Sequence, residues 1–197
     1  MRKVIFFIIF LSMLSCSTKE LKELGALPKK ENPEYEKTLA KYTKTYRLYD
    51  QFETKAIVSA TIFNEDFIKS YVKERERYSK TEEFQAFLDR ENFLLKNYLR
   101  FFVSFYTPNE ELIDLDKTNS VWKAFLETSD GKRIYPFSIK KAEEHRDVLT
   151  HYFPYLDYWA KPYYINFKKD EIDFSKEKKL ILNFVSVLGK ISLEFSL

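Results

Sequence analysis

Hydrophobic and polar residues alternate over much of the chain after residue 45. From Tyr46 to Ile62 the even positions are mostly apolar and the odd positions mostly polar. A period of two is typical of a β-strand with one buried face. This stretch therefore predicts one long strand, or two strands joined by a bend near residues 50–53, with the even positions inward. Such alternation is typical of antiparallel sheets.

The period changes between residues 64 and 96. Asn64 is a favourable N-cap residue, and apolar residues follow it at helical spacing. A second run of apolar residues, from Phe84 to Leu95, falls on one face of another helix. We expect two helices at about 64–96, inserted between strands.

Period two returns in the second half of the chain. Further strands are expected over 99–105, 121–128, 133–139 and 163–167, with a helix over 142–153. Gly131 lies in a loop that joins two of these strands as a hairpin. Pro136 marks its strand as an edge strand or as the site of a bulge, because proline has no N–H for the ladder.

Residues 180–197 predict a C-terminal hairpin. The two-residue turn that we expect at Gly189 and Lys190 places Phe184 opposite Phe195. A three-residue loop gives the alternative register, with Val187 opposite Ile191.

About seven antiparallel strands with a helical insertion predict a mainly β fold. We expect an antiparallel β-sandwich that is immunoglobulin-like in outline, with the two helices at about 64–96 as the insertion. The alternative is an α+β fold in which helices cover a single sheet. A chain of 197 residues has the size of one domain, and we expect a single globular domain over 46–197.

The composition narrows the possible chemistry. Apolar residues make up 45% of the chain, so it can bury a core, but it has only 3 glycines. Phosphate-binding loops need clustered glycines, so the sequence argues against a nucleotide-binding protein, and no cofactor is expected.

The first residues have the order basic, apolar, small. Arg2 and Lys3 precede an apolar run over 4–14, and Ser15 and Cys16 follow. This order is typical of a secretory signal peptide, which we place at 1–15. The run of about 11 residues reaches only about half of a ~30 Å hydrocarbon core, which disfavours a permanent transmembrane helix.

The sequence Met13-Leu14-Ser15-Cys16 resembles the lipobox of bacterial lipoproteins. The resemblance implies attachment of a diacylglycerol to the Cys16 thiol, cleavage before Cys16 and acylation of the new N-terminus, so that lipid anchors the chain to a membrane. It implies an extracytoplasmic place in the bacterial cell envelope. Ser17 after the cysteine is compatible with the outer membrane, if the organism has one.

Residues 16–45 read as the lipidated N-terminus and a tether. Lysine and glutamate are frequent there, and Pro28 and Pro33 interrupt the pattern. The alternative is a short helix over 19–24 that packs on the domain. Cleavage removes two of 33 basic residues and none of 30 acidic ones, which leaves a formal charge of +1 and argues against a nucleic-acid partner.

Candidate catalytic and metal-binding residues are sparse. In a helix, Glu144, Asp147 and His151 would share one face, but this set is a loose match to a metal site, and we assign neither metal ligands nor catalytic residues. No G-x-S-x-G motif is present. These observations favour a noncatalytic protein.

Aromatic residues are the unusual feature, at 18% of the chain, and they cluster in residues 151–164. Tyr155, Tyr158 and Trp159 are the candidate binding residues, because aromatic side chains on a surface loop offer stacking faces. We favour the alternative in which the cluster plugs one end of the sandwich and Trp159 is buried. Trp122, on a predicted strand, is expected in the core.

Two classes of function remain. The first is a noncatalytic envelope lipoprotein that binds or assembles with a protein partner. The second is a glycan-binding accessory protein or a hydrolase that uses the aromatic loop.

Overall fold

The computed structural model describes residues 32–78 and 81–197. The expected signal peptide, the lipidation site Cys16 and the alternative helix over 19–24 lie outside these residues. The helices are α1 (Pro33–Tyr42), α2 (Glu65–Glu76), α3 (Thr81–Asn97) and α4 (Arg146–Tyr152), with short 3-10 turns η2 (Glu110–Leu112) and η3 (Lys169–Glu171). The strands are β1 (Thr43–Asp50), β2 (Glu53–Phe63), β3 (Tyr98–Tyr106), β4 (Lys123–Glu127), β5 (Arg133–Ile134), β6 (Ser138–Lys141), β7 (Lys161–Lys168), β8 (Lys179–Ser186) and β9 (Gly189–Ser196).

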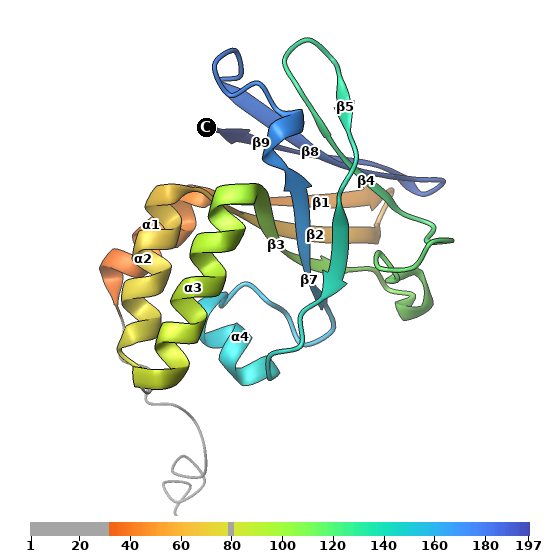
Figure 1. Ribbon diagram of the computed structural model, residues 1–197. Helices are drawn as coiled ribbons and strands as arrows, with labels where there is room; N and C mark the ends of the chain where they lie inside the picture. The colour runs from red at the N-terminus through yellow and green to blue at the C-terminus, as the bar shows by residue number, and fades with distance from the viewer. Residues whose placement is uncertain (1–31, 79–80) are drawn as a thin grey trace, which may run out of the picture. The chain divides into compact units, whose positions relative to one another are not determined.

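The strands form two antiparallel sheets that pack as a sandwich (Figure 1). One sheet has the order β1-β2-β3-β7-β6 and the other the order β5-β4-β8-β9. Rings from both sheets meet in the core: Phe101 contacts Phe195, and Phe105 contacts Phe184, with centroids 5.1 and 5.4 Å apart. The predicted β-sandwich with a helical insertion is confirmed. Its strand order differs from that of an immunoglobulin domain, whose sheets have the orders ABED and CFG.

The bend and the helical insertion are where the sequence pattern predicts them. Gln51, in the turn between β1 and β2, has a φ of 54°. The even positions of β2 from Ala56 to Ile62 are buried. Asn64 caps α2 by accepting a hydrogen bond from the Phe67 backbone N–H at 2.9 Å.

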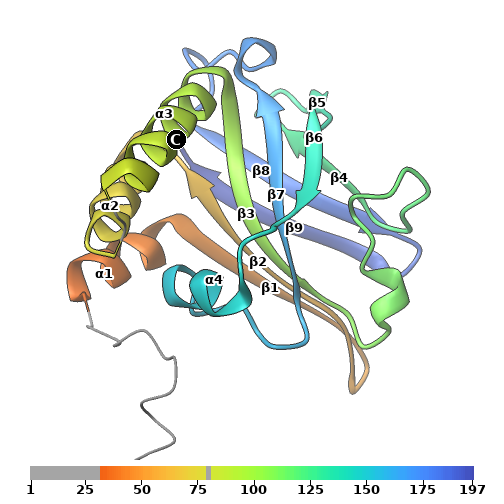
Figure 2. The same cartoon turned by 60° about the horizontal axis from the view of Figure 1, so that its bottom comes forward.

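The helices cover the outer face of the five-stranded sheet, the face turned away from the second sheet (Figure 2). This arrangement creates a second apolar layer, in which Phe63 of β2 packs against Phe67 and Tyr71 of α2. Many of the chain's aromatic residues lie in this layer. The alternative prediction expected a sheet covered by helices. Such a sheet is present as one of the two sheets of the sandwich.

Pro136 separates two edge strands that belong to different sheets. β5, before it, is at the edge of the four-stranded sheet, and β6, after it, is at the edge of the five-stranded sheet. The expected edge position is confirmed. The single strand expected over 133–139 is instead two strands, because the chain crosses from one sheet to the other at the proline.

The C-terminal hairpin has a register that differs from both predicted ones. Phe184 lies opposite Ile191, and the turn residues are Val187 and Leu188. Ser186 closes the turn by accepting a hydrogen bond from the Leu188 N–H at 3.0 Å. The predicted pairing of Phe184 with Phe195 is wrong. Because the shift is by an even number of residues, the apolar face remains inward.

The folded region begins earlier than the expected boundary at residue 46. Part of the expected tether forms α1 and the start of β1. Tyr35, Leu39 and Tyr42 of α1 are buried, and the Tyr35 hydroxyl donates to the Tyr152 carbonyl at 2.8 Å. These three residues have helical spacing, but the pattern is short and the surrounding charged residues obscure it.

Candidate functional site

The aromatic segment 151–164 contains both buried and exposed rings. Phe153 is fully buried and stacks on Phe102 of β3. Tyr158 and Trp159 are 74% and 60% exposed. The expected burial of Trp159 is therefore wrong, because the chain turns outward after its first aromatic residues have packed on the sheet.

Hydrogen bonds hold the outward loop in place. Arg146 of α4 donates from Nη1 to the Asp157 carbonyl and from Nη2 to the Ala160 carbonyl, both at 2.8 Å. Asp157 Oδ1 accepts a hydrogen bond from the Trp159 backbone N–H at 2.9 Å. The rings of Tyr158 and Trp159 meet edge to face, with centroids 5.1 Å apart. The two rings are thus presented on a braced loop.

A groove of about 500 Å³ lies between this loop and the outer face of β1, β2 and β3. Tyr155 and Trp159 line its loop side. Hydroxyl groups line the sheet side, from Thr45, Thr54, Ser59 and Ser104. Arg47 and Asp157 are its charged lining residues within the described chain. The structure thus brings two of the three candidate residues to one groove, while Tyr158 stands beside Trp159 outside it.

Hydrogen bonds also order the floor of the groove. The Tyr155 hydroxyl shares a hydrogen bond with Thr61 Oγ1, at an O–O distance of 2.5 Å. Thr45 Oγ1 and Ser59 Oγ share another at 2.8 Å. Burial raises the pKa of Tyr155 well above its usual value, so the phenol is neutral at physiological pH. The groove therefore presents hydroxyl groups, which donate and accept hydrogen bonds without charge.

The described residues of the groove do not include a pair of carboxyl groups. Among the described residues that line it, Asp157 alone carries a carboxyl group. Most glycoside hydrolases place two carboxyl groups on either side of the scissile bond. The groove has the chemistry for recognising a polyhydroxylated ligand, and its described residues do not supply that pair.

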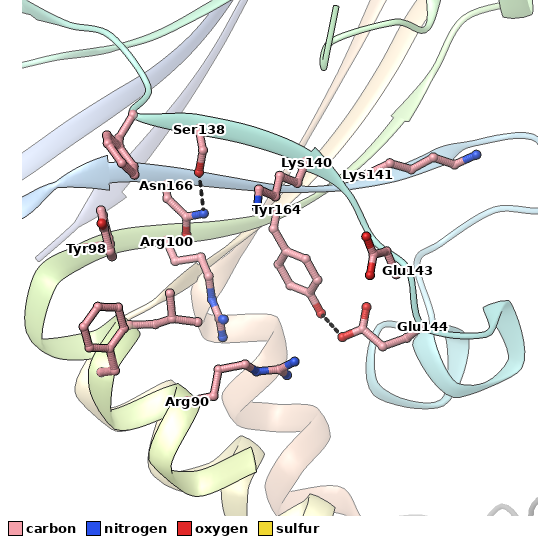
Figure 3. A pocket seen from close by; sticks show the side chains of 13 residues that line it. Arg90, Tyr98, Arg100, Ser138, Lys140, Lys141, Glu143, Glu144, Tyr164 and Asn166 are labelled. Atoms are coloured by element: carbon pink, nitrogen blue, oxygen red, sulfur yellow. Dashed lines mark hydrogen bonds between the residues drawn. The ribbon is translucent and has the colours of Figure 1, made fainter. Parts of the chain in front are cut away.

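A second cavity, of about 670 Å³, lies between α3 and the outer face of β3, β7 and β6 (Figure 3). The sequence patterns described above do not predict it. Its floor is built on Arg100, which pairs with Glu91 of α3: Nη1 donates to Oε1 at 3.2 Å, and Nη2 contacts Oε2. Both side chains are buried, and the guanidinium lies over the Phe63 ring, 4.1 Å from its centroid.

The sequence contained a signal for this pair. Glu91 interrupts the apolar face of α3, and Arg100 lies between the apolar residues Leu99 and Phe101 of a strand. A charge at an expected core position needs a partner, because burying it alone is costly. Two such charges in adjacent elements could have been paired on this ground.

The candidate metal residues do not come together. Glu144 precedes α4 and accepts a hydrogen bond from the Tyr164 hydroxyl at 3.1 Å. His151 Nε2 lies 3.7 Å from Glu74 Oε1, and Asp147 lies near His145. Over residues 32–78 and 81–197, no group of three histidine, cysteine or acidic residues is placed to hold a metal ion.

No known protein family, curated protein or solved structure matches this chain. Within the described residues, no helix is both long and apolar enough to cross a membrane.

Proposed function

We propose that this protein is a noncatalytic glycan-binding module of the bacterial cell envelope, anchored through lipid on Cys16 on the extracytoplasmic side. The observation that carries the proposal is the exposed ring of Trp159 at the edge of a groove lined by hydroxyl groups. The lipobox resemblance supports the anchor, and Ser17 is compatible with the outer membrane where one exists.

The exposed ring suits a sugar. One face of a pyranose ring presents C–H groups, which pack against an aromatic ring through dispersion and burial of apolar area. Asp157 holds the Trp159 backbone N–H, and the Trp159 ring packs edge to face with the exposed ring of Tyr158. A preordered ring loses little conformational entropy when a ligand binds, which favours affinity.

The polar groups of the groove suit the hydroxyls of the same ligand. Ser59 and Ser104 are buried on the sheet, and Arg47 and Asp157 offer a planar donor and a planar acceptor. Sugar hydroxyls donate and accept at once, so a mixed set of this kind can satisfy them. Among the described residues that line the groove, Asp157 is the single carboxylate, which supports ligand binding in preference to hydrolysis.

The test measures binding to purified peptidoglycan sacculi and to soluble chitotetraose. The wild type should sediment with the sacculi, and Trp159→Ala should reduce the bound fraction by about tenfold, as expected for an aromatic anchor. Tyr135→Ala is the matched control, because Tyr135 is 63% exposed and does not line the groove. Absence of wild-type binding to both glycans, or equal losses in the two variants, would overturn the proposal.

A further inference from the structure

The cavity beneath α3 has the size and construction of a ligand site, and the glycan groove does not include it. Its volume of about 670 Å³ is within the range of small-molecule pockets. The two concavities lie at opposite ends of β3: Arg100 lines the cavity, and Ser104 and Tyr106 line the groove. Between them Phe102 is covered by Phe153.

The floor of the cavity holds polar atoms without partners. Arg100, Asn166 and Ser138 are neighbours across three strands, and Asn166 Nδ2 donates to Ser138 Oγ at 3.0 Å (Figure 3). Arg100 Nε and Asn166 Oδ1 are buried, and within the described chain neither has a hydrogen-bond partner. Buried donors are nearly always paired, because their loss of hydration is otherwise uncompensated. An occupant that offers an acceptor would satisfy Arg100 Nε, whereas Asn166 Oδ1 is itself an acceptor and needs a donor.

The charges around the floor favour an anionic acceptor. Glu91 faces two guanidinium groups, since Arg90 Nη2 lies 3.5 Å from the same carboxylate that pairs with Arg100. The other charged residues that line the cavity are two lysines and two glutamates, whose charges balance: Lys140, Lys141, Glu143 and Glu144. The excess positive charge therefore lies beside the unpartnered Nε.

The opening of the cavity is aromatic. Phe93 and Phe137 are 61% and 56% exposed, and both line the cavity. Tyr98 lies between them, stacked on Phe137 with centroids 5.2 Å apart and edge to face with Phe93 at 6.4 Å. Two exposed rings with a half-buried ring between them form an apolar wall that a ligand can cover.

We propose that this cavity binds an amphipathic carboxylate, with the acid group at Arg100 and Arg90 and an apolar group against Phe93, Tyr98 and Phe137. A carboxylate supplies the acceptor that Arg100 Nε lacks and neutralises the excess charge. The apolar group accounts for the exposed rings, which a small inorganic anion would leave uncovered.

The test uses the processed chain from residue 16 onward with Cys16→Ser, so that no lipid competes for the cavity. This chain includes the whole compact unit Glu31–Leu197. The probe is 3-phenylpropionate, compared with 3-phenylpropan-1-ol, which lacks the charge, and propionate, which lacks the ring. The first should bind at least about tenfold more tightly than either of the others. Its titration should move the Nε–Hε resonance of Arg100 in a ¹H–¹⁵N spectrum.

Two variants keep the test independent of folding. Arg90→Gln and Phe137→Ala change side chains that are more than half exposed, and each should weaken binding of 3-phenylpropionate by about threefold or more. Tyr135→Ala, outside the cavity, should leave it unchanged. The inference is overturned if the Arg100 resonance does not move at about 10 mM probe. Equal affinity for propionate or for the alcohol would also overturn it. None of these outcomes depends on glycan binding.

Discussion

Phe153 stacks on Phe102 with ring centroids 3.8 Å apart and an interplanar angle of 13°. Phe102 is the central outward residue of β3, and Phe153 is the first residue after α4. This contact divides the outer face of the five-stranded sheet into the groove beside Trp159 and the cavity beneath α3. The positions of both candidate sites therefore depend on it.

Replacing Phe153 should destabilise the fold. Phe153→Ala leaves a cavity beside Phe102, and we expect a loss of about 3–5 kcal/mol in the free energy of unfolding. Tyr158→Ala, on the same segment but exposed, should change it by less than about 0.5 kcal/mol. Urea denaturation checks both values. Similar midpoint shifts in the two variants would contradict the assignment of buried and exposed rings.

The buried ion pair of α3 and β3 should respond strongly to loss of one partner. Glu91→Ala leaves Arg100 buried without its carboxylate, which should cost about 3–5 kcal/mol. The double variant Glu91→Leu with Arg100→Met should be less destabilised than Glu91→Ala, because no unpaired charge is left. Glu83→Ala, an exposed position of the same helix, is the control. A double variant that is less stable than Glu91→Ala would contradict this account.

The observed hairpin register requires a glycine at position 189. Its φ is +139°, and a Cβ there would lie 2.9 Å from Leu48 Cδ2. Gly189→Ala should therefore cost about 1 kcal/mol or more. Val187→Ala should have little effect, because Val187 is 94% exposed in the turn. Thermal or urea unfolding checks the difference, and a neutral Gly189→Ala variant would argue against the observed register.

Acid should weaken the contact between α2 and α4. Burial is the largest cause that lowers the pKa of His151, Arg77 lowers it further, and Glu74 opposes them. The unfolded chain therefore binds the proton first, so this part of the stability is complete above pH about 6.5 and is lost as the pH falls below it. Urea midpoints between about pH 7.5 and pH 5 should fall less steeply in His151→Asn than in the wild type.

The matched control for this pH effect is His145→Asn, because the His145 side chain is 76% exposed. Its urea midpoints should follow the wild-type pH dependence. Identical pH slopes in the wild type and His151→Asn would show that His151 does not contribute.

Local patterns predicted most of the fold. The alternation in β2 predicted the first strands, and the Asn64 cap predicted the start of the helical insertion. Both signals depend only on residues that are neighbours in sequence. The predicted hairpin register is wrong because alternation does not encode the Ser186 hydrogen bond in the turn or the close approach of Leu48 to Gly189. The pairing of Glu91 with Arg100 also depends on a tertiary contact, because it forms only where α3 folds back on β3.

The candidate binding residues illustrate the same limit. Composition marked the aromatic segment as unusual, but burial of Phe153 and exposure of Trp159 are decided by tertiary contacts with Phe102 and Arg146. A run of similar aromatic residues gives no periodic signal that separates inward from outward rings.

The most direct test of the glycan proposal follows the two tryptophans of the chain during a chitotetraose titration. Trp122 is 1% exposed in the core, and Trp159 is 60% exposed at the groove. The indole N–H resonance of Trp159 should move progressively with chitotetraose while that of Trp122 stays in place. A Trp159 resonance that does not move while the sugar is raised to millimolar concentration, or equal shifts of both resonances, would contradict the account.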